Sequence, residues 1–234
     1  MAYLEGKNLV ASYGVVPILH ECSVEVEKGE LAVIVGPNGA GKSTVMRVLL
    51  GMLEATSGSV TLDGKDISML STQDRIGKGL AFVPQTKNVF PSMTVEENLQ
   101  MGGFIRKDDI SNTINEVYEL FPILYEKRKQ LAEQLSGGQR QQVAFGRAMM
   151  TKPSIMLLDE PTAGVSPIVM DEIFSNILDV KNAGMAVLMV EQNAQQALNI
   201  ADKGFVLVSG RNEHTGTGKE LINDNEVRKK FLGG

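Results

Sequence analysis

The chain has 234 residues, 43% of them apolar, and a net charge of −5 from 23 basic and 28 acidic side chains. This composition fits one large domain or two small ones, excludes a disordered chain, and argues against nucleic acid as the partner. The single Cys22, the lack of a signal peptide and apolar runs far below the roughly 20 residues that span a bilayer together predict a cytoplasmic location.

The first thirty residues alternate as strands with one wet face do, most clearly where Val24 and Val26 alternate with Glu25 and Glu27. They predict an antiparallel sheet. A continuous apolar strand, "LAVIV" at 31–35, then leads through a glycine-rich turn into the helical pattern that starts at Lys42. This order of strand, loop and helix is typical of an α/β protein.

The remaining strands are mostly continuous apolar runs, as in a parallel sheet buried on both faces. They are expected at 59–64, 79–85, 154–160, 185–191 and 204–210. Between Thr94 and about Thr151, helical patterns replace them. We therefore expect a single domain over 1–234, with a core at 1–87 and 152–234 and an inserted helical lobe at about 88–151.

The stretch "GPNGAGKST" matches the phosphate-loop pattern G-x-x-x-x-G-K-[ST] between a buried strand and a helix. Its glycines let successive N–H groups converge on phosphate oxygens at the helix N-terminus. Lys42 would place its charge near the β- and γ-phosphates, Ser43 would bind Mg²⁺, and Thr44 would reach an α-phosphate. The rest of the predicted loop is Gly36, Asn38, Gly39, Ala40 and Gly41.

A second apolar strand, in "SIMLLDEP", runs into Asp159 and Glu160. Ligands of open parallel sheets gather at the carboxyl ends of strands, so both carboxylates are expected beside the phosphate loop. Asp159 would hold Mg²⁺ through water, and Glu160 would orient and deprotonate the attacking water. The alternative is a strand that simply ends in solvated charges.

With "LSGGQ" at Leu135–Gln139, directly before a long helical pattern, the three motifs resemble, over essentially the whole chain, the ATP-binding subunits of ABC transporters. The resemblance implies a P-loop NTPase core with a mostly parallel sheet, an N-terminal antiparallel β subdomain and a helical lobe. It also implies ATP and Mg²⁺ as cofactors, and a two-fold dimer that closes over two ATP molecules.

The resemblance assigns further residues. Tyr13 would stack on the adenine; Tyr3 is a weaker candidate, and a core or edge role for either remains open. Gln85 would sense Mg²⁺. Ser136, Gly137 and Gly138 would touch the γ-phosphate of the opposite subunit. A plain helix cap accounts for Ser136, but we expect it not to account for two glycines followed by Gln139.

Two positions depart from the family pattern. Ser166 stands where an aspartate is usual; it is expected to cap the helix that begins at Pro167, without the family's carboxylate. Gln192 stands where a histidine is usual, and neither His20 nor His214 has the spacing to replace it. Gln192 could donate a hydrogen bond to the γ-phosphate, or could be merely a polar strand end. The two nucleotide sites of a natural pair are therefore expected to be unequal.

Narrower features resemble the LivF-type ATPases of branched-chain amino-acid uptake: Asn88 to Phe104, "EPTAGVSP", and the ending "NEVRKKFLGG". This implies a second ATPase subunit, identical or different, and membrane permeases served by a solute-binding protein, with the chain peripheral on the inner face of the cell membrane. Permease contact is expected near Val89, Phe90, Pro91 and Met93, with packing between the lobes as the alternative. Urea or amide uptake, lipopolysaccharide-type export and a soluble iron–sulfur assembly factor remain alternative functions.

Overall fold

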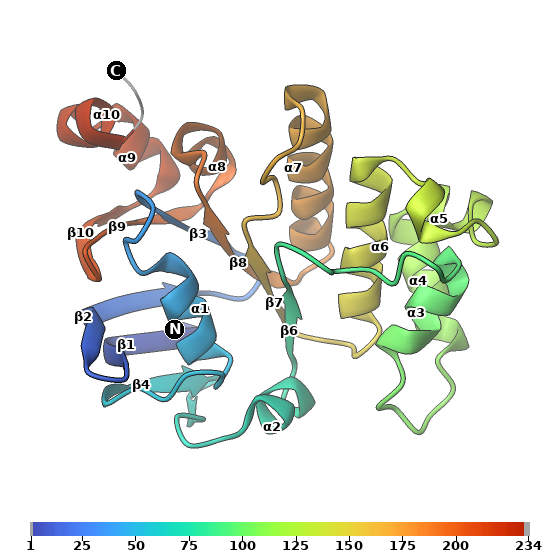
Figure 1. Cartoon of the computed structure of the whole chain (residues 1–234), viewed down its shortest axis with the longest axis horizontal. Helices are drawn as coiled ribbons and strands as arrows, with labels where there is room; N and C mark the ends of the chain where they lie inside the picture. Colours follow the sequence, from blue (N-terminus) through green and yellow to red (C-terminus); the bar gives the residue numbers. More distant parts are fainter. Residues whose placement is uncertain (1, 232–234) are drawn as a thin grey trace.

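The computed structural model describes residues 2–231, so the last three residues of the ending "NEVRKKFLGG" lie outside the described part. Two sheets and their helices form the body of the molecule, and a group of helices stands to one side of it (Figure 1). Among the described residues, no helix is long and apolar enough to cross a membrane.

The first sheet is antiparallel with the order β2-β1-β4-β5, and alternate residues of its strands are buried. The alternation predicted for the first thirty residues therefore corresponds to β1 and β2, and the later segment β4 joins them. The strands are β1 (Leu4–Tyr13), β2 (Val16–Val26), β4 (Ser57–Leu62) and β5 (Lys65–Asp66).

The second sheet has the order β10-β9-β3-β8-β7-β6, and only the β10–β9 pair is antiparallel. Its apolar strands are buried on both faces, as their continuous apolar runs predict. The strands are β3 (Leu31–Val35), β6 (Leu80–Val83), β7 (Ile155–Asp159), β8 (Ala186–Glu191), β9 (Lys203–Val208) and β10 (Arg211–Gly216).

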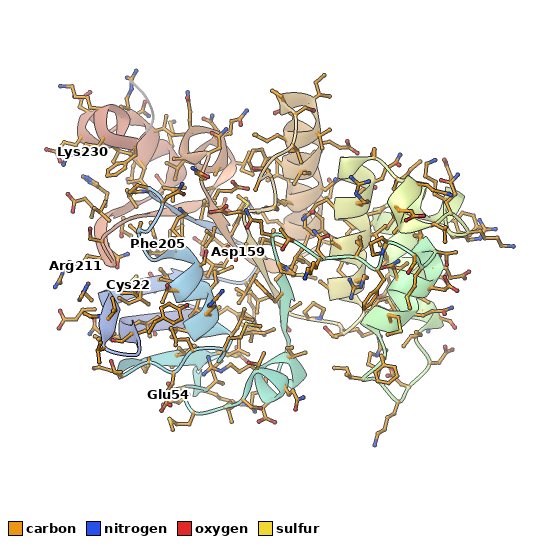
Figure 2. The ribbon with its side chains drawn as sticks, in the orientation of Figure 1. Cys22, Glu54, Asp159, Phe205, Arg211 and Lys230 are labelled. Carbon is orange, nitrogen blue, oxygen red and sulfur yellow. The ribbon has the colours of Figure 1, made fainter. Side chains whose placement is uncertain are left out.

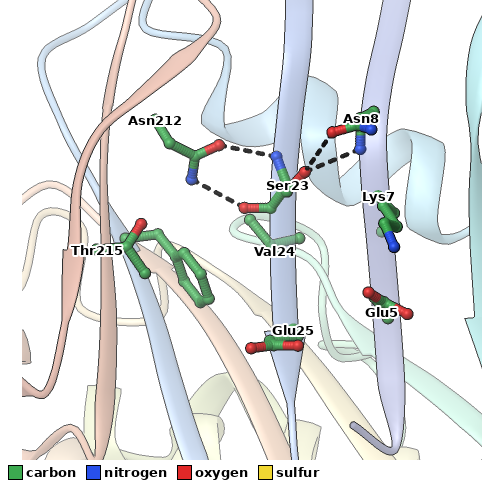
Figure 3. A pocket seen from close by; sticks show the side chains of 10 residues that line it. Glu5, Lys7, Asn8, Ser23, Val24, Glu25, Asn212 and Thr215 are labelled. Atoms are coloured by element: carbon green, nitrogen blue, oxygen red, sulfur yellow. Dashed lines mark hydrogen bonds between the residues drawn. The ribbon is translucent and has the colours of Figure 1, made fainter.

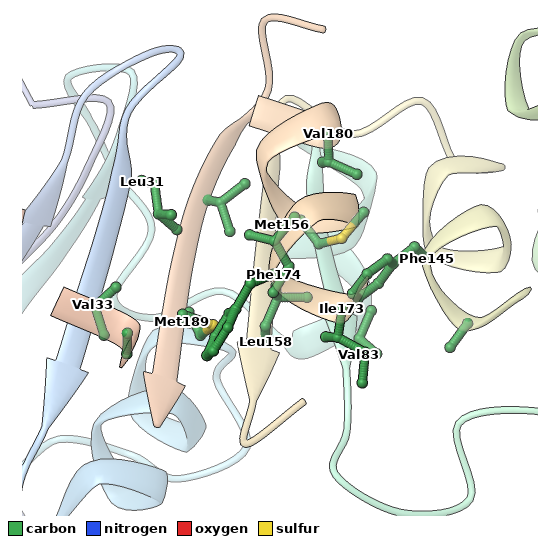
Figure 4. Close-up of a cluster of buried hydrophobic side chains, with 14 of the residues drawn as sticks. Leu31, Val33, Val83, Phe145, Met156, Leu158, Ile173, Phe174, Val180 and Met189 are labelled. Atoms are coloured by element: carbon green, nitrogen blue, oxygen red, sulfur yellow. The ribbon is translucent and has the colours of Figure 1, made fainter. Parts of the chain in front are cut away.

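The core lies on both faces of this second sheet. Leu31, Val33 and Val35 of β3 belong to one apolar cluster, and the alternate residues Ala32 and Ile34 belong to the other. Figure 4 shows the first cluster, where side chains of α6 and α7 meet those of β7 and β8. Tight packing here fixes the strand ends that carry the polar site residues.

Helices cover the sheets and form the lateral group (Figure 1). The helical patterns predicted to start at Lys42 and after Ser136 each form one continuous helix, and loops separate the helices of the predicted lobe. The helices are α1 (Lys42–Leu49), α2 (Thr72–Gly77), α3 (Val95–Gly102), α4 (Ser111–Leu120), α5 (Pro122–Glu126), the 3₁₀ turn η1 (Ala132–Gln134), α6 (Gly137–Met149), α7 (Pro167–Asn182), α8 (Ala194–Ile200), α9 (Gly218–Asn223) and α10 (Asn225–Phe231).

The predicted α/β fold class, with its antiparallel N-terminal sheet and mostly parallel second sheet, is confirmed. The edge strand β10 and the short helix α2 were not predicted. The predicted lobe boundaries at 88 and 151 stay a prediction, although α3 to α6 all lie between them.

Candidate functional site

The phosphate loop joins the end of β3 to the start of α1. Gly36 has φ 153°, and a Cβ there would lie 2.2 Å from the carbonyl oxygen of Leu207, so no other residue fits. Gly41 is the N-cap of α1 with φ 100°, and it has no side chain to bond the first N–H groups. These N–H groups and the helix dipole therefore favour an anion at this end of α1. Asn38 and Gly39 are exposed on the loop, whereas Ala40 and Thr44 are buried beneath it.

Lys42 is 5% exposed and keeps its ammonium inside the loop. Its Nζ donates to the carbonyl oxygens of Gly36 at 2.9 Å and Pro37 at 3.3 Å, and it lies 3.9 Å from Glu160 Oε1. Burial lowers the pKa of Lys42, while the nearby Glu160 raises it in part. The result is a buried positive charge surrounded by oxygen atoms, as a phosphate-binding lysine requires.

Ser43 and Asp159 form the second part of the site. The Ser43 hydroxyl donates to Asp159 Oδ1 at 3.4 Å, bringing the start of α1 to the end of β7. Asp159 lies near the centre of the molecule (Figure 2). Burial raises the pKa of Asp159 above its ordinary value, against the opposing effects of Ser43, Arg47 and Lys42. A hydroxyl and a carboxylate are oxygen ligands of the type that Mg²⁺ prefers.

Glu160 follows Asp159 in a left-handed backbone conformation with φ 45°, which is unusual for a residue with a side chain. Its N–H donates to the carbonyl of Val190 at 2.9 Å, and its Oε2 accepts from Gln85 Nε2 at 3.0 Å. The carboxylate is thus held between the amide of Gln85 and the ammonium of Lys42. The structure thus brings Lys42, Ser43, Gln85, Asp159 and Glu160 together in one site.

Glu191 at the end of β8 belongs to the same region and was not predicted to have a role. It is only 1% exposed, and its Oε1 accepts from both the backbone N–H and the hydroxyl of Thr162. Burial raises its pKa. By holding Thr162, Glu191 fixes the loop that follows Glu160. A glutamate that directly continues an apolar strand was the signal available in the sequence.

Gln192 comes next, with an exposed side chain. Its backbone N–H donates to Glu191 Oε2 at 3.2 Å, and its side chain has no hydrogen-bond partner within residues 2–231. In the sheet register, Glu191 pairs with Val35, directly before the phosphate loop. Gln192 therefore lies beside the start of the phosphate loop, whereas the two histidines lie elsewhere, on β2 and β10.

The two tyrosines differ in exposure. Tyr13 ends β1 and is 43% exposed, and its hydroxyl accepts a hydrogen bond from Arg47 Nη1 at 3.2 Å. The Arg47 guanidinium lies over one face of the ring, 5.9 Å from its centroid, and the rest of the exposed ring is open to a planar ligand. Tyr3 is 7% exposed and belongs to the core, with Lys28 over its ring. Of the two, only Tyr13 could stack on a nucleotide base.

The signature residues form the N-terminus of α6, and no described hydrogen bond or ion pair joins them to the phosphate loop. Helix α6 packs with α7 in the apolar cluster on one face of the second sheet, whereas α1 packs in the cluster on the other face. Ser136 and Gln139 form a reciprocal capping box, so a plain helix cap does account for Gln139, contrary to expectation. A Cβ at Gly138 would lie 2.4 Å from the Glu172 carboxylate. At Gly137 its nearest neighbour would be Val169, at an ordinary 3.6 Å. Only Gly137 therefore lacks a local structural reason.

The expectation for Ser166 was wrong in one respect. Ser166 is the N-cap residue of α7 and Pro167 follows in the first turn, as predicted, but the Ser166 side chain makes no capping hydrogen bond. The fixed φ of Pro167 and the extended backbone of Ser166 start the helix instead.

The segment after Gln85 lies against α3 and α6. Val89 packs on the core, whereas Phe90 is 38% exposed and lies under the Arg147 guanidinium, 4.4 Å from the ring centroid. Pro91 is exposed and Met93 is half-buried. Beside this segment runs a groove of about 340 Å³, whose lining includes Phe82, Lys87, Asn88, Met101, Ile105 and Arg147.

Comparisons with known proteins agree with this geometry. A protein-family model described as ABC transporter matches residues 19–163. The branched-chain amino acid transport ATP-binding protein BraG of Pseudomonas aeruginosa is 45% identical, over 95% of this chain and 96% of that protein. The corresponding probable LivF of Archaeoglobus fulgidus is 38% identical, over 97% of each. The lipopolysaccharide export ATP-binding protein LptB of Haemophilus influenzae is 35% identical, over 100% of this chain and 98% of that protein.

Among solved structures, the ADP conformation of MJ1267, an ATP-binding cassette of an ABC transporter, superimposes with a TM-score of 0.90 at 31% identity, over 100% of both chains. The resemblance inferred from the three motifs is thereby confirmed. The match to the family model over more than half of the chain, together with these near full-length relatives, shows that the chain belongs to the ABC transporter family, as an ATP-hydrolysing cassette.

Proposed function

We propose that the chain hydrolyses ATP with Mg²⁺ to drive the import of branched-chain amino acids through membrane permeases. The observation that carries the hydrolytic part is the position of Glu160, between the Gln85 amide and the Lys42 ammonium at the mouth of the phosphate loop. A carboxylate held this way can accept a proton from a water molecule beside the bound phosphates.

The other residues of the site bind ATP and Mg²⁺ and orient them for the reaction. Backbone N–H groups at the start of α1 and the Lys42 ammonium hold the β- and γ-phosphates, and Tyr13 stacks on the adenine. Ser43, Asp159 and Gln85 would hold Mg²⁺, which when bound neutralises charge that develops on the phosphate oxygens. Gln192 donates a hydrogen bond to the γ-phosphate without adding charge.

The second nucleotide-facing surface is the N-terminus of α6. Because no hydrogen bond or ion pair of the described residues joins it to the chain's own phosphate loop, Ser136 and Gly137 are proposed to contact the nucleotide of another subunit, identical or different. Gly137 has space for close backbone approach, while the Ser136–Gln139 capping box keeps the helix end rigid. Closure of such a dimer would complete both sites and exclude water.

The solute is inferred from the relatives. Two branched-chain amino-acid transport proteins, from a bacterium and an archaeon, are 45% and 38% identical, and the lipopolysaccharide export protein is 35% identical. The higher identity favours branched-chain amino acids over export. The permeases would dock in the groove beside Phe90 and Pro91, which places the chain on the inner face of the membrane, with a solute-binding protein acting on the other side.

Glu160→Gln tests the proposal directly. In the complex with its permeases, the variant should still bind ATP, but its ATP turnover should fall about 10²- to 10⁴-fold, because the general base is lost. ATP-driven uptake of labelled leucine should fall with it. Glu54→Gln, an exposed site far from the crevice, is the matched control. ATP turnover at the wild-type rate in Glu160→Gln would refute the proposed mechanism. ATP turnover without leucine uptake in the wild-type complex would refute the assignment of branched-chain amino acids as the solute.

A further inference from the structure

Polar groups that line the cavity between β2 and β10 bond to one another (Figure 3). Asn212 accepts from the Ser23 N–H at 2.7 Å and donates to the Ser23 carbonyl at 2.8 Å, and Ser23 Oγ accepts from the Asn8 N–H at 2.8 Å. The start of α6 differs, because two of its backbone N–H groups have no hydrogen-bond partner within residues 2–231. Donors are thus left free at the helix end that the proposed function assigns to a nucleotide.

The free donors are the N–H groups of Gly137 and Gly138. The first turn of an α-helix has four N–H groups without a partner inside the helix. In α6 the capping box satisfies the other two: the Ser136 N–H donates to Gln139 Oε1 at 3.1 Å, and the Gln139 N–H donates to Ser136 Oγ at 3.2 Å. The two glycine N–H groups, at the positive end of the helix dipole, are therefore the donors that α6 offers to a phosphate.

The carboxylate of Glu172, on α7, lies beside these donors. A Cβ added to Gly138 would lie 2.4 Å from Glu172 Oε2 and 2.8 Å from Glu172 Oε1, so both carboxylate oxygens are close to the Gly138 backbone. The nearest neighbour of a Cβ added to Gly137 would be Val169, at 3.6 Å. Residues three apart share one face of a helix, and α7 therefore presents an apolar and an acidic side chain to the first turn of α6.

The Glu172 carboxylate is not held in this position. Its side chain is exposed and, within the described chain, has no hydrogen bond or ion pair. In the absence of nucleotide, its charge complements the dipole of α6. The same charge would repel a γ-phosphate that approaches the two glycines, because negative groups a few ångströms apart interact unfavourably even near a protein surface.

We propose that Glu172 weakens ATP binding at the site formed with the neighbouring subunit, by keeping a negative charge at the helix end that receives the γ-phosphate. Its charge acts on bound ATP before and during hydrolysis alike, so it raises the KM for ATP and leaves kcat nearly unchanged. This role rests on the proposed function, in which the start of α6 contacts the nucleotide of another subunit.

Glu172→Gln tests this role, because it removes the charge and keeps the size of the side chain. In the complex with its permeases, the KM for ATP should fall about three- to tenfold, while kcat changes less than about twofold. The effect is limited to this range because the exposed carboxylate can turn into solvent. Glu172→Asp keeps the charge and should keep the KM closer to that of the wild type. Asp171→Asn, the same change of charge at the exposed neighbouring position on α7, is the matched control and should leave the KM nearly unchanged.

Ionic strength separates an effect of charge from an effect on structure. The difference in KM between the wild type and Glu172→Gln should shrink between about 0.05 M and about 0.5 M salt, because exposed charges are screened. A purely structural role would instead give Glu172→Gln a lower unfolding temperature with the wild-type KM at every salt concentration, and would overturn the proposal. A higher KM in Glu172→Gln would overturn it as well.

Ser136→Ala in the same complex distinguishes the two levels of the hypothesis. If Ser136→Ala lowers ATP turnover and Glu172→Gln has the wild-type KM, only the role of Glu172 is refuted. If neither substitution changes turnover or KM, no nucleotide reaches the start of α6, and the proposed contact with a neighbouring subunit's nucleotide is refuted too.

Discussion

At the scale of single residues, Gln192 combines a fixed backbone with a free side chain. Glu191 accepts from its N–H and from Thr162, which anchors the end of β8 to the loop that carries Glu160. The Gln192 amide is exposed at the crevice and has no partner in the described chain. It can therefore turn towards a phosphate oxygen without breaking any existing hydrogen bond.

Gln192→Ala should lower the ATP turnover of the assembled transporter about five- to ten-fold, the effect of losing one neutral hydrogen bond. The loss should be far smaller than that of Glu160→Gln, because no proton is transferred by the amide. Steady-state ATP hydrolysis at saturating ATP measures it, with Gln195→Ala on the exposed face of α8 as the control. Wild-type activity in Gln192→Ala would leave the glutamine as no more than a polar strand end.

The phosphate loop and the two carboxylates could be predicted because their positions follow from local rules, whereas Gln85 and Gln192 were assigned only from the family resemblance. A phosphate loop must lie between strand and helix, and the carboxyl ends of parallel strands meet, so Ser43 and Asp159 come together. Glu191 could not be assigned in the same way. Its partner Thr162 lies 29 residues earlier, and only the folded loop shows that the carboxylate points inward.

At the scale of elements, apolar runs predicted the buried strands. The elements that they did not predict, β10 and α2, were missed for physical reasons. Strand β10 consists of polar and small residues with no fully buried position, so neither continuous nor alternating apolar residues mark it. Helix α2 has only 6 residues and one buried side chain, Arg75. Contacts with other parts of the fold hold both β10 and α2 in place. The amino-acid composition of the two segments does not reveal such contacts.

Arg75 shows how α2 supports the phosphate-loop helix. Its guanidinium is 3% exposed and donates to the carbonyls of Val48 and Leu49 at the end of α1, and to those of Ser68 and Leu70. A cation at this end also complements the dipole of α1. Among the described residues, the charge is held by hydrogen bonds to carbonyl oxygens, with no carboxylate in hydrogen-bond contact.

Arg75→Met should destabilise the chain by about 3 kcal/mol or more, because several buried carbonyls lose their donor. Arg75→Lys should recover only part of this, since an ammonium cannot reach all four carbonyls in the planar geometry of arginine. Urea unfolding followed by circular dichroism gives both values. Lys78→Met, at the exposed end of α2, is the control; an Arg75→Met chain as stable as this control would contradict the supporting role.

At the scale of the whole molecule, the two surfaces proposed to face nucleotides are expected to serve different nucleotide sites. The phosphate loop leads into α1, whose apolar side chains pack on one face of the second sheet, whereas those of α6 pack on the other face. Substitution at Lys42 should therefore impair the chain's own site, whereas substitution at Ser136 should impair the site of the neighbouring subunit. In a pair with a different ATPase, the two sites then need not be equal.

We expect the site built on this chain's phosphate loop to be the slower one, because Gln192 supplies no charge to the γ-phosphate. In a complex reconstituted with a second ATPase subunit, Lys42→Ala should therefore reduce total ATP turnover less than the matching lysine substitution in the partner. Ser136→Ala should act on the faster, opposite site and so cost more than Lys42→Ala. Single-turnover measurements on each mixed complex give the two rates separately. Two equal rates would show that the uncharged glutamine has no effect on the balance between the sites.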